Sequence, residues 1–244
     1  MEILKISLGG RVAHFGINGT NDKNNRYSFQ HITGSNIKGI LGAIAGYNGW
    51  NELDKKASIP EFLEKLKDLE YGVIPKKPKF NSTIQKYNNT TGVNKDDKGG
   101  TSLQITEEFL EEVSWDIYLK NLPLEVKNSI LNGVSVYPTS LGKKGCFINK
   151  FDIEILRGDE IESNKLQSIF PAEFLKEEDL SLEFNLLDDD FLEDDFVFLY
   201  SEDFFQETKN YAISKNTLKE KVKCISVDEK NIYMIGGNLW RNTY

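Results

Sequence analysis

The sequence contains few cysteines and few histidines. Of its 244 residues, two are cysteine and two are histidine. Cys146 and Cys224 provide neither a disulfide framework nor a zinc site with four ligands, and such sparse cysteine usage is typical of the reducing cytoplasm. His14 and His31 have no cysteine or carboxylate cluster beside them, so the default interpretation of each is a hydrogen-bonded structural residue. We therefore expect no metal and no cofactor.

Long hydrophobic runs and common catalytic motifs are also absent. No apolar run approaches the ~18 residues of a transmembrane helix, and the opening residues Met1–Lys5 show no signal-peptide pattern, so we expect a cytoplasmic protein without a membrane contact. The chain has no nucleotide-binding P-loop, no zinc-peptidase motif and no serine-hydrolase elbow. The acidic runs Asp188–Asp190 and Glu193–Asp195 could bind a divalent cation, although such runs more often form solvated loops.

Charge is unevenly distributed along the chain. The net charge of −8 argues against a nucleic-acid-binding protein. However, residues 1–157 carry 21 Lys and Arg against 18 Asp and Glu, whereas residues 158–244 carry 9 against 20. This asymmetry indicates two surfaces with different partners, unless it only reflects two differently solvated faces. We expect residues 158–244 to face away from any bound nucleic acid, because carboxylates repel phosphates.

A glycine-rich stretch at residues 33–47 predicts the first helix. Its large apolar residues have the i, i+3, i+4, i+7 spacing of one helical stripe: Ile37, Ile40, Leu41 and Ile44. An adjoining face repeats this spacing with small residues: Gly39, Gly42, Ala43 and Gly46. Glycines inside a helix cost roughly 1 kcal/mol each, so another segment is expected to approach closely there. Thr33 or Ser35 can cap the helix, and its N-terminus with Lys38 suits a phosphate. The alternative is a packed core helix without a ligand.

Hydrophobic periodicity predicts an α+β protein. Up to residue 157 the expected strands are residues 2–8, 71–74, 103–105, 113–119, 134–138 and 146–156, and the expected helices are residues 35–46, 59–69 and 123–131. Ser58 and Glu61 fit a capping box at the second helix. Strands interleaved with helices favour an α+β sandwich of ferredoxin type. Beyond residue 157 the expected strands are residues 180–187, 196–200, 221–227 and 231–235.

The segment Pro75–Thr101 differs in kind from its surroundings. It is rich in Asn, Thr, Ser and Gly, and it contains the aromatic residues Phe80 and Tyr87. Its lysines outnumber its two aspartates: Lys76, Lys77, Lys79, Lys86, Lys95 and Lys98. Basic residues with interleaved aromatics suit a single-stranded nucleic acid, because cations hold phosphates and rings stack on bases. A second basic loop, Thr139–Gly145, contains Lys143 and Lys144. The alternative is a solvated loop that is merely rich in lysine.

Three stretches occur in a characteristic order. They are an opening strand followed by Gly10–Phe15, the glycine-rich Gly34–Gly46, and Val136–Lys143 before a further strand. Together with the strand Trp115–Leu119, they resemble the Cas-five family of the RAMP superfamily, a subunit of type I CRISPR Cascade complexes. The likeness covers residues 1–157 well and the rest weakly, and the size of the chain suggests subtype I-B.

The resemblance implies both a fold and a function. The fold would be a ferredoxin-like (RRM-like) domain over residues 1–157, with an inserted basic thumb at about residues 75–101, followed by a smaller, acidic, β-rich C-terminal lobe over residues 158–244. The function would be that of a non-catalytic RNA-binding subunit in antiviral defence. It would grip the 5′ handle of the CRISPR RNA and cap the filament of backbone subunits, with the large subunit docking nearby and target DNA reached only through the complex.

The expected RNA contacts combine this resemblance with the charge pattern. The phosphate candidates outside the two basic segments are Arg11, Arg26 and Lys38. The candidates for contact with bases are His14, Tyr87 and Tyr137. The lysine candidates are Lys76, Lys77, Lys79, Lys86, Lys143 and Lys144. We expect these residues to bind the single-stranded 5′ end of the RNA, since splayed single-stranded bases are the usual target of sequence-specific RNA recognition.

Two alternatives stay open. One branch of the family cleaves precursor CRISPR RNA with a tyrosine and a Lys-His pair in its later part. Here both histidines precede residue 32 and no Lys-His dipeptide exists, so that general acid–base machinery is not visible and we expect no catalytic residue. The first alternative is nevertheless a metal-independent endoribonuclease that processes precursor CRISPR RNA, and the second is a stand-alone RRM-like binder.

Overall fold

The long strand β5 (Ser102–Lys120) is the centre of the main sheet. In this computed structural model, which describes residues 1–17, 24–52, 59–90, 102–181, 197–204 and 207–236, the sheet has the order β13-β3-β5-β1-β6. Its other strands are β1 (Glu2–Ala13), β3 (Glu70–Pro75), β6 (Lys150–Arg157) and β13 (Ile235–Gly236). All of these neighbours pair antiparallel. The short β2 (Asn25–Arg26) joins β5 in parallel. The chain is therefore an α+β protein with a mostly antiparallel sheet, as predicted.

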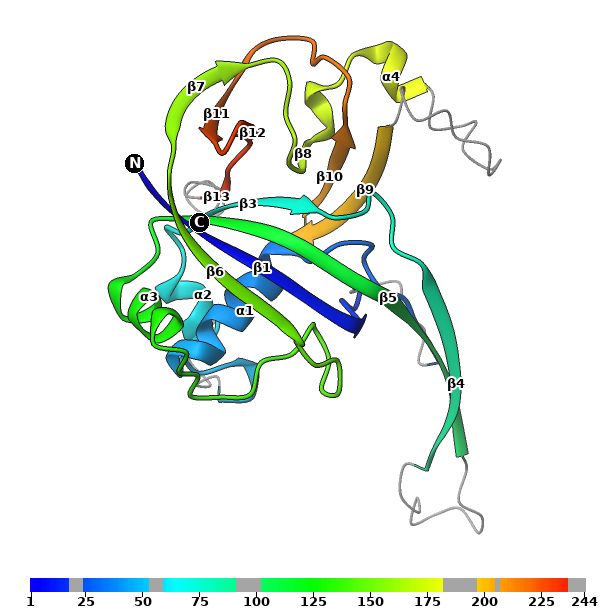
Figure 1. Cartoon of the computed structure of the whole chain (residues 1–244). Coiled ribbons are helices and arrows are strands. Elements are labelled where there is room, and N and C mark those ends of the chain that lie inside the picture. Colours follow the sequence, from blue (N-terminus) through cyan, green and yellow to red (C-terminus); the bar gives the residue numbers. More distant parts are fainter. Residues whose placement is uncertain (18–23, 53–58, 91–101, 182–196, 205–206, 237–244) are drawn as a thin grey trace.

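Three helices cover one face of this sheet, and we call the assembly the palm (Figure 1). They are α1 (Gly34–Ala45), α2 (Glu61–Lys65) and α3 (Leu124–Leu131). The predicted alternation of the first strand is confirmed, since Leu4, Ile6 and Leu8 point into the same core as the apolar stripe of α1. A short 3₁₀ helix, η1 (Trp50–Glu52), lies between α1 and α2.

The glycine-rich helix packs closely on its neighbours, as its spacing predicts. A Cβ at Gly42 would lie 2.5 Å from the Cβ of Phe62 in α2, so only glycine permits this approach. Thr33 caps the helix, because its hydroxyl accepts a hydrogen bond from the Asn36 N–H at 3.3 Å. The helix ends at Gly46, which has the left-handed φ of 83° that glycine adopts without strain.

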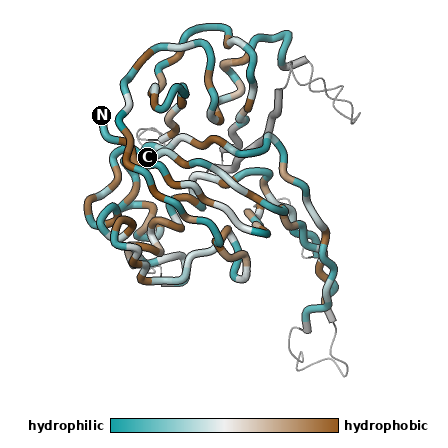
Figure 2. Tube along the Cα trace, viewed as in Figure 1, coloured by the Kyte–Doolittle hydropathy of each residue, from teal (hydrophilic) through white to brown (hydrophobic). Residues whose placement is uncertain are grey.

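The predicted basic loop is in large part a β-hairpin. β4 (Ser82–Thr90) pairs antiparallel with the first half of β5, from Ser82 opposite Leu110 to Thr90 opposite Ser102. We call these two paired segments the hairpin, and Figure 1 shows it projecting away from the palm. Its exposed strand β4 is mostly hydrophilic (Figure 2), which is why its sequence resembles a loop. The tip at residues 91–101, including Lys95 and Lys98, lies outside the described residues.

The C-terminal part covers the palm face that the helices leave free (Figure 1). It contains two three-stranded sheets, β8-β10-β9 and β12-β11-β7. Their strands are β7 (Asp159–Ser163), β8 (Phe170–Pro171), β9 (Val197–Phe204), β10 (Glu207–Ser214), β11 (Val222–Val227) and β12 (Lys230–Ile232), and two short helices accompany them, η2 (Ala172–Phe174) and α4 (Glu177–Ser181). We call this part the lobe. Ile3 and Tyr118 of the palm share a buried cluster with Ile225, Val227 and Ile232 of the lobe, so the two parts pack through an apolar contact.

Three expected strands need correction. Residues 134–138 form no strand, because their N–H groups instead satisfy the end of α1: Val136 donates to the Ile44 carbonyl at 3.2 Å and Tyr137 to the Ala43 carbonyl at 3.0 Å. The strand expected over residues 146–156 begins only at Lys150. Residues 180–181 belong to α4 rather than to a strand.

Several expectations fall on residues that the structure does not describe. The rest of the expected strand at residues 182–187 lies outside the described residues, as do the acidic runs Asp188–Asp190 and Glu193–Asp195 and the Ser58 side of the capping box. Among the described residues, no three His, Cys, Asp or Glu side chains are grouped as metal ligands would be. Within the same ranges, every helix is too short or too polar to cross a membrane.

Candidate nucleic-acid interface

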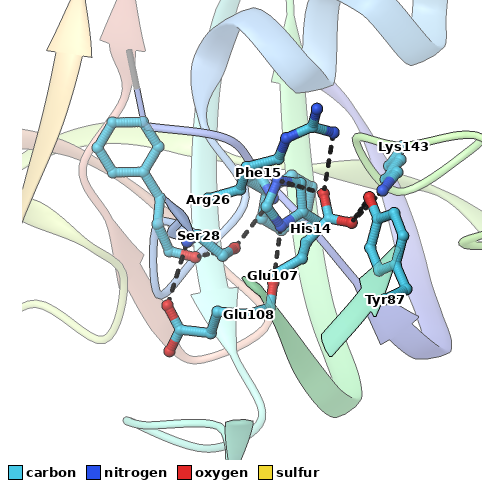
Figure 3. Close-up of polar contacts among 9 residues, drawn as sticks. His14, Phe15, Arg26, Ser28, Tyr87, Glu107, Glu108 and Lys143 are labelled. Atoms are coloured by element: carbon cyan, nitrogen blue, oxygen red, sulfur yellow. Dashed lines mark hydrogen bonds and ion pairs between the residues drawn. The ribbon is translucent and has the colours of Figure 1, made fainter. Parts of the chain in front are cut away.

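Four of the predicted RNA-binding residues meet at the base of the hairpin. His14 follows β1, Arg26 lies in β2, Tyr87 lies in β4, and Lys143 comes from the basic loop after α3. Figure 3 shows that all four side chains point toward one carboxylate, that of Glu107 in β5. The sequence separates these residues by more than 120 positions, and only the pairing of β1, β2 and β4 with β5 brings them together.

Glu107 is buried, with 1% of its side chain exposed. Its Oε2 atom accepts hydrogen bonds from the Lys143 ammonium and, at 3.0 Å, from the Tyr87 hydroxyl. Its Oε1 atom lies 3.6 Å from His14 Nε2 and 3.8 Å from Arg26 Nη1, beyond the range of a hydrogen bond. The four donors therefore converge on a single acceptor group from both of its sides.

The balance of these contacts keeps Glu107 ionised. Burial alone would raise the pKa of its carboxyl group, but the hydrogen bonds from Lys143 and Tyr87 and the charges of Lys143 and His14 outweigh burial, so the pKa lies below its ordinary value. One negative charge then faces two permanent cations, Lys143 and Arg26. The Glu107 carboxylate therefore has two cations within 4 Å, and both are partly exposed.

Aromatic and backbone contacts hold the remaining members in place. The Lys143 ammonium lies 5.8 Å from the ring centre of Tyr87 and 5.3 Å from that of Phe109, which is cation–π distance. His14 Nδ1 lies 2.7 Å from the Glu108 carbonyl oxygen, so Nδ1 carries a proton and donates it there. These contacts leave His14 only slightly exposed, while the outer parts of Lys143 and Arg26 are open to solvent at 33% and 39%.

This arrangement is suited to binding a phosphate and an aromatic base. Guanidinium and ammonium groups form charge-assisted hydrogen bonds with phosphate oxygens, and the half-exposed ring of Tyr87 offers a face on which a base can stack. The close acid–base groups could also move protons, which bears on the nuclease alternative.

The structure places the other lysine candidates elsewhere. Lys76 is paired with Asp116, and its ammonium donates to the carboxylate at 2.5 Å. The remaining exposed cations form no ion pair with any residue in the described ranges: Arg11, Lys77, Lys79, Lys86 and Lys144. Tyr137 is exposed beside the end of α1 rather than near Glu107.

Lys38 does not fit the predicted phosphate contact. Its side chain is buried, and burial lowers its pKa to about 8 although the charge of Asp68 acts in the opposite direction. The N-terminus of α1 is also enclosed, since a Cβ at Gly34 would collide with the Tyr71 hydroxyl. Here the alternative of a packed core helix describes α1 better, because Lys38 precedes Leu41 and Gly42 by one turn and shares their packed side.

Sequence reasoning missed the two buried carboxylates, Glu107 and Asp116. Glu107 lies in the acidic run 107–112, which has the composition of a solvated surface. Its burial follows from its register opposite Gln85 and from the loop that carries Lys143, and no local pattern encodes either. Asp116 occupies a polar position of a predicted strand. The lobe covers the face of the sheet on that side, and this could be recognised only from the structure.

Comparison with known proteins supports the fold. No protein-family model and no curated protein matches the chain. A chain from a structure described as a "CRISPR RNA-guided surveillance complex" is 10% identical, with 89% of this chain and 91% of that chain covered and a TM-score of 0.51. A CRISPR protein from Archaeoglobus fulgidus is 13% identical, with 97% and 99% covered and a TM-score of 0.51. This chain therefore has the fold of CRISPR-associated proteins over nearly its whole described length, and the resemblance drawn from its motifs is confirmed at the level of fold.

Proposed function

We propose that the chain is the Cas-five subunit of a type I CRISPR Cascade complex, of subtype I-B, and that it binds the 5′ handle of the CRISPR RNA without cleaving it. In this role it caps the filament of backbone subunits, contacts the large subunit, and reaches target DNA only through the complex. The observation that carries the proposal is the convergence of His14, Arg26, Tyr87 and Lys143 at the base of a projecting hairpin, on a fold shared with CRISPR-associated proteins.

The strand order supports a ferredoxin-like assignment for the palm. Four palm strands and the intervening helices follow one another as strand, helices, strand, strand, helix, strand, and the strands are arranged in the order β6-β1-β5-β3. This is the succession of elements in ferredoxin-like domains. The hairpin between β3 and β5 then corresponds to the expected thumb.

The position of the lobe directs the RNA toward the hairpin. RRM domains stack bases on aromatic residues of the open sheet face. On this palm the corresponding face is covered by the lobe, and its aromatic residue Tyr118 is fully buried. RNA phosphates would instead meet Arg26 and Lys143 and the exposed lysines of the hairpin, while a base would stack on Tyr87. We expect the acidic lobe to face away from this path, because carboxylates repel phosphates.

A binding assay and a copurification assay test this proposal together. We expect the purified full-length chain to bind an RNA with the repeat-derived 5′ handle of the host CRISPR array more tightly than a scrambled RNA of equal length, by at least about tenfold, or 1.4 kcal/mol. Affinity-tagged chain isolated from the host should copurify with CRISPR RNA and further Cascade subunits. Equal affinity for both RNAs, or isolation of the chain without RNA and partners, would contradict the proposal.

One observation favours the nuclease alternative. His14, Tyr87 and Lys143 all approach Glu107, and metal-independent RNA cleavage needs such acid–base groups close together. Incubation of the chain with repeat RNA, with and without magnesium, separates the two functions. We expect intact RNA; product bands that disappear in the His14→Ala or Tyr87→Phe variant would favour the nuclease.

A further inference from the structure

Attraction of RNA to the base of the hairpin does not by itself require Glu107. A buried carboxylate is costly unless its partners are well placed, and an exposed lysine or arginine would bind phosphate without one. Here the carboxylate holds side chains from three separate segments against β5: β2, β4 and the loop that carries Lys143. Figure 3 shows Glu107 between Arg26 and Lys143, with Tyr87 beside Lys143.

Glu107 contacts its three partners in two ways, by hydrogen bonds to Tyr87 and Lys143 and by an ion pair with Arg26. The Tyr87 hydroxyl donates to Oε2 at 3.0 Å, which fixes the ring on the same side as the Lys143 ammonium. Arg26 Nη1, at 3.8 Å from Oε1, leaves part of its guanidinium open to solvent. The other titratable groups that face the cluster are His14 and Glu108, and the Glu108 carboxylate accepts the Ser28 N–H at 3.2 Å. Glu107 thus orients Lys143 and Tyr87 by hydrogen bonds and attracts Arg26 by its charge.

We propose that Glu107 is a positioning residue that sets RNA specificity: it holds Lys143, Arg26 and Tyr87 so that one backbone phosphate and the adjoining base of the 5′ handle are bound together. This inference rests on the proposed RNA-binding function. Pre-organised side chains favour the one ligand geometry that they match, because the cost of ordering them is already met. Freely moving cations would bind any phosphate, and specificity is a difference between two affinities.

The Glu107→Gln variant separates positioning from simple attraction. It removes the charge that restrains both cations while it retains a side chain of the same size. We expect this variant to keep or increase its affinity for a scrambled RNA and to lose affinity for the handle RNA, so that the ratio of the two falls from at least about tenfold to below about threefold. Fluorescence anisotropy with both labelled RNAs on the full-length chain measures the ratio. Glu112→Gln is the matched control, because it removes the same charge from an exposed position of β5, and it should keep the wild-type ratio.

A second variant keeps the inference testable if Glu107→Gln fails to fold. Tyr87→Phe removes only the hydroxyl that Glu107 orients, at a half-exposed position. We expect it to lower the affinity for handle RNA without changing the slope of affinity against salt, since no charge is lost. In the Glu107→Gln background the same change should have no further effect.

The outcomes distinguish this inference from the proposed function. If the wild type discriminates between the two RNAs but Glu107→Gln keeps its ratio, or weakens both RNAs equally, the positioning role is wrong and RNA binding stands. A folded Tyr87→Phe variant with wild-type affinity also contradicts the positioning role. If the wild type does not discriminate, the proposed function itself fails, and the positioning role fails with it.

Discussion

Two buried carboxylates on the same strand have different surroundings. Glu107 and Asp116 both lie in β5, and each is about 1% exposed. Asp116 has both oxygens satisfied, because Oδ1 accepts from the Ser7 hydroxyl at 2.7 Å and Oδ2 from Lys76 at 2.5 Å. The nearby Lys5 is already paired with Glu154 at 3.0 Å. Charges around Asp116 are therefore balanced within the palm.

Glu107 is less completely satisfied and is surrounded by more positive charge. Its Oε1 atom lies 3.6 Å from His14 Nε2 and 3.8 Å from Arg26 Nη1 but accepts no hydrogen bond from another described residue. For Asp116, burial would raise the pKa, but hydrogen bonds from Lys76 and Ser7 outweigh burial and lower it. Both groups are thus ionised, but Glu107 has two partly exposed cations within 4 Å, Lys143 and Arg26, whereas Asp116 has one, Lys76. The difference supports the proposal that Glu107 organises a ligand site, whereas Asp116 is balanced by contacts within the palm.

The largest expected effect is a loss of stability at acidic pH that comes from His31 and precedes the titration of the two carboxylates. His31 is buried, its Nε2 donates to the Pro78 carbonyl at 2.8 Å, and the Trp115 indole N–H lies 3.4 Å from Nδ1. Burial lowers the pKa of His31 to about 4, against the hydrogen bond to Pro78, which acts in the opposite direction. Because the unfolded chain binds this proton already near pH 6.5, stability should fall by about 3 kcal/mol as the pH drops from 6.5 to 4.

Urea unfolding at several pH values measures this loss. The pKa values of both carboxylates are lowered, so their contribution to stability should be lost only below their unfolded values near 4, as the pH falls through the folded ones. The His31→Gln variant should be less stable at pH 7 but should show a much flatter slope between pH 6.5 and 4.5. An unchanged slope in this variant would mean that a group other than His31 titrates in that range.

The next effect tests the basic segment that leads into the hairpin against the lobe. Lys77, Lys79 and Lys86 are exposed and form no ion pair within the described parts of the chain. Changing all three to Glu should weaken binding of handle RNA on the order of a hundredfold at 0.1 M salt and flatten its salt dependence, because three counterion-releasing contacts are reversed. The matched control reverses three exposed lysines of the lobe, Lys219, Lys221 and Lys223. A comparable loss in that control would contradict the path along the hairpin.

A smaller effect separates the two carboxylates by stability. Lys76→Met removes the cation that satisfies Oδ2 of Asp116, and we expect a loss of about 1–2 kcal/mol, reduced by the partial exposure of Lys76. Lys143→Met should cost less, since Tyr87, Arg26 and His14 remain around Glu107. Chemical denaturation of both variants measures the difference, and an equal or larger loss in Lys143→Met would assign Glu107 a role in the fold like that of Asp116.

More of the palm than of the candidate site could be predicted from the sequence. Period-two alternation located β1, and the glycine spacing of α1 predicted the close approach at Gly42, because both patterns are local consequences of one element packing on another. Residues 134–138 alternate like a strand, but they have no partner strand and instead bind the free carbonyls of α1. The alternation could not reveal this, since it says nothing about the partner.

Four residues of the site could be predicted from the sequence, but their arrangement around Glu107 could not. His14, Arg26, Tyr87 and Lys143 were each chosen for chemical type, and the structure brings these four together. Their meeting point, Glu107, depends on strand register and on a loop that crosses from elsewhere in the chain. Lys38 was chosen by the same reasoning and is buried, because it lies one turn before Leu41 and Gly42 on the packed side of α1.

The most direct test compares two lysines, one beside each carboxylate. The slope of log affinity against log salt for handle RNA should decrease by about 0.7 in Lys143→Met, because one phosphate contact is lost from single-stranded RNA. The same slope should stay at its wild-type value in Lys76→Met, because Lys76 pairs with Asp116 and does not belong to the cluster of Arg26, Tyr87 and Lys143 around Glu107. Equal slopes in Lys143→Met and wild type, or a larger decrease in Lys76→Met, would contradict the assignment of the RNA site to Glu107 and its partners.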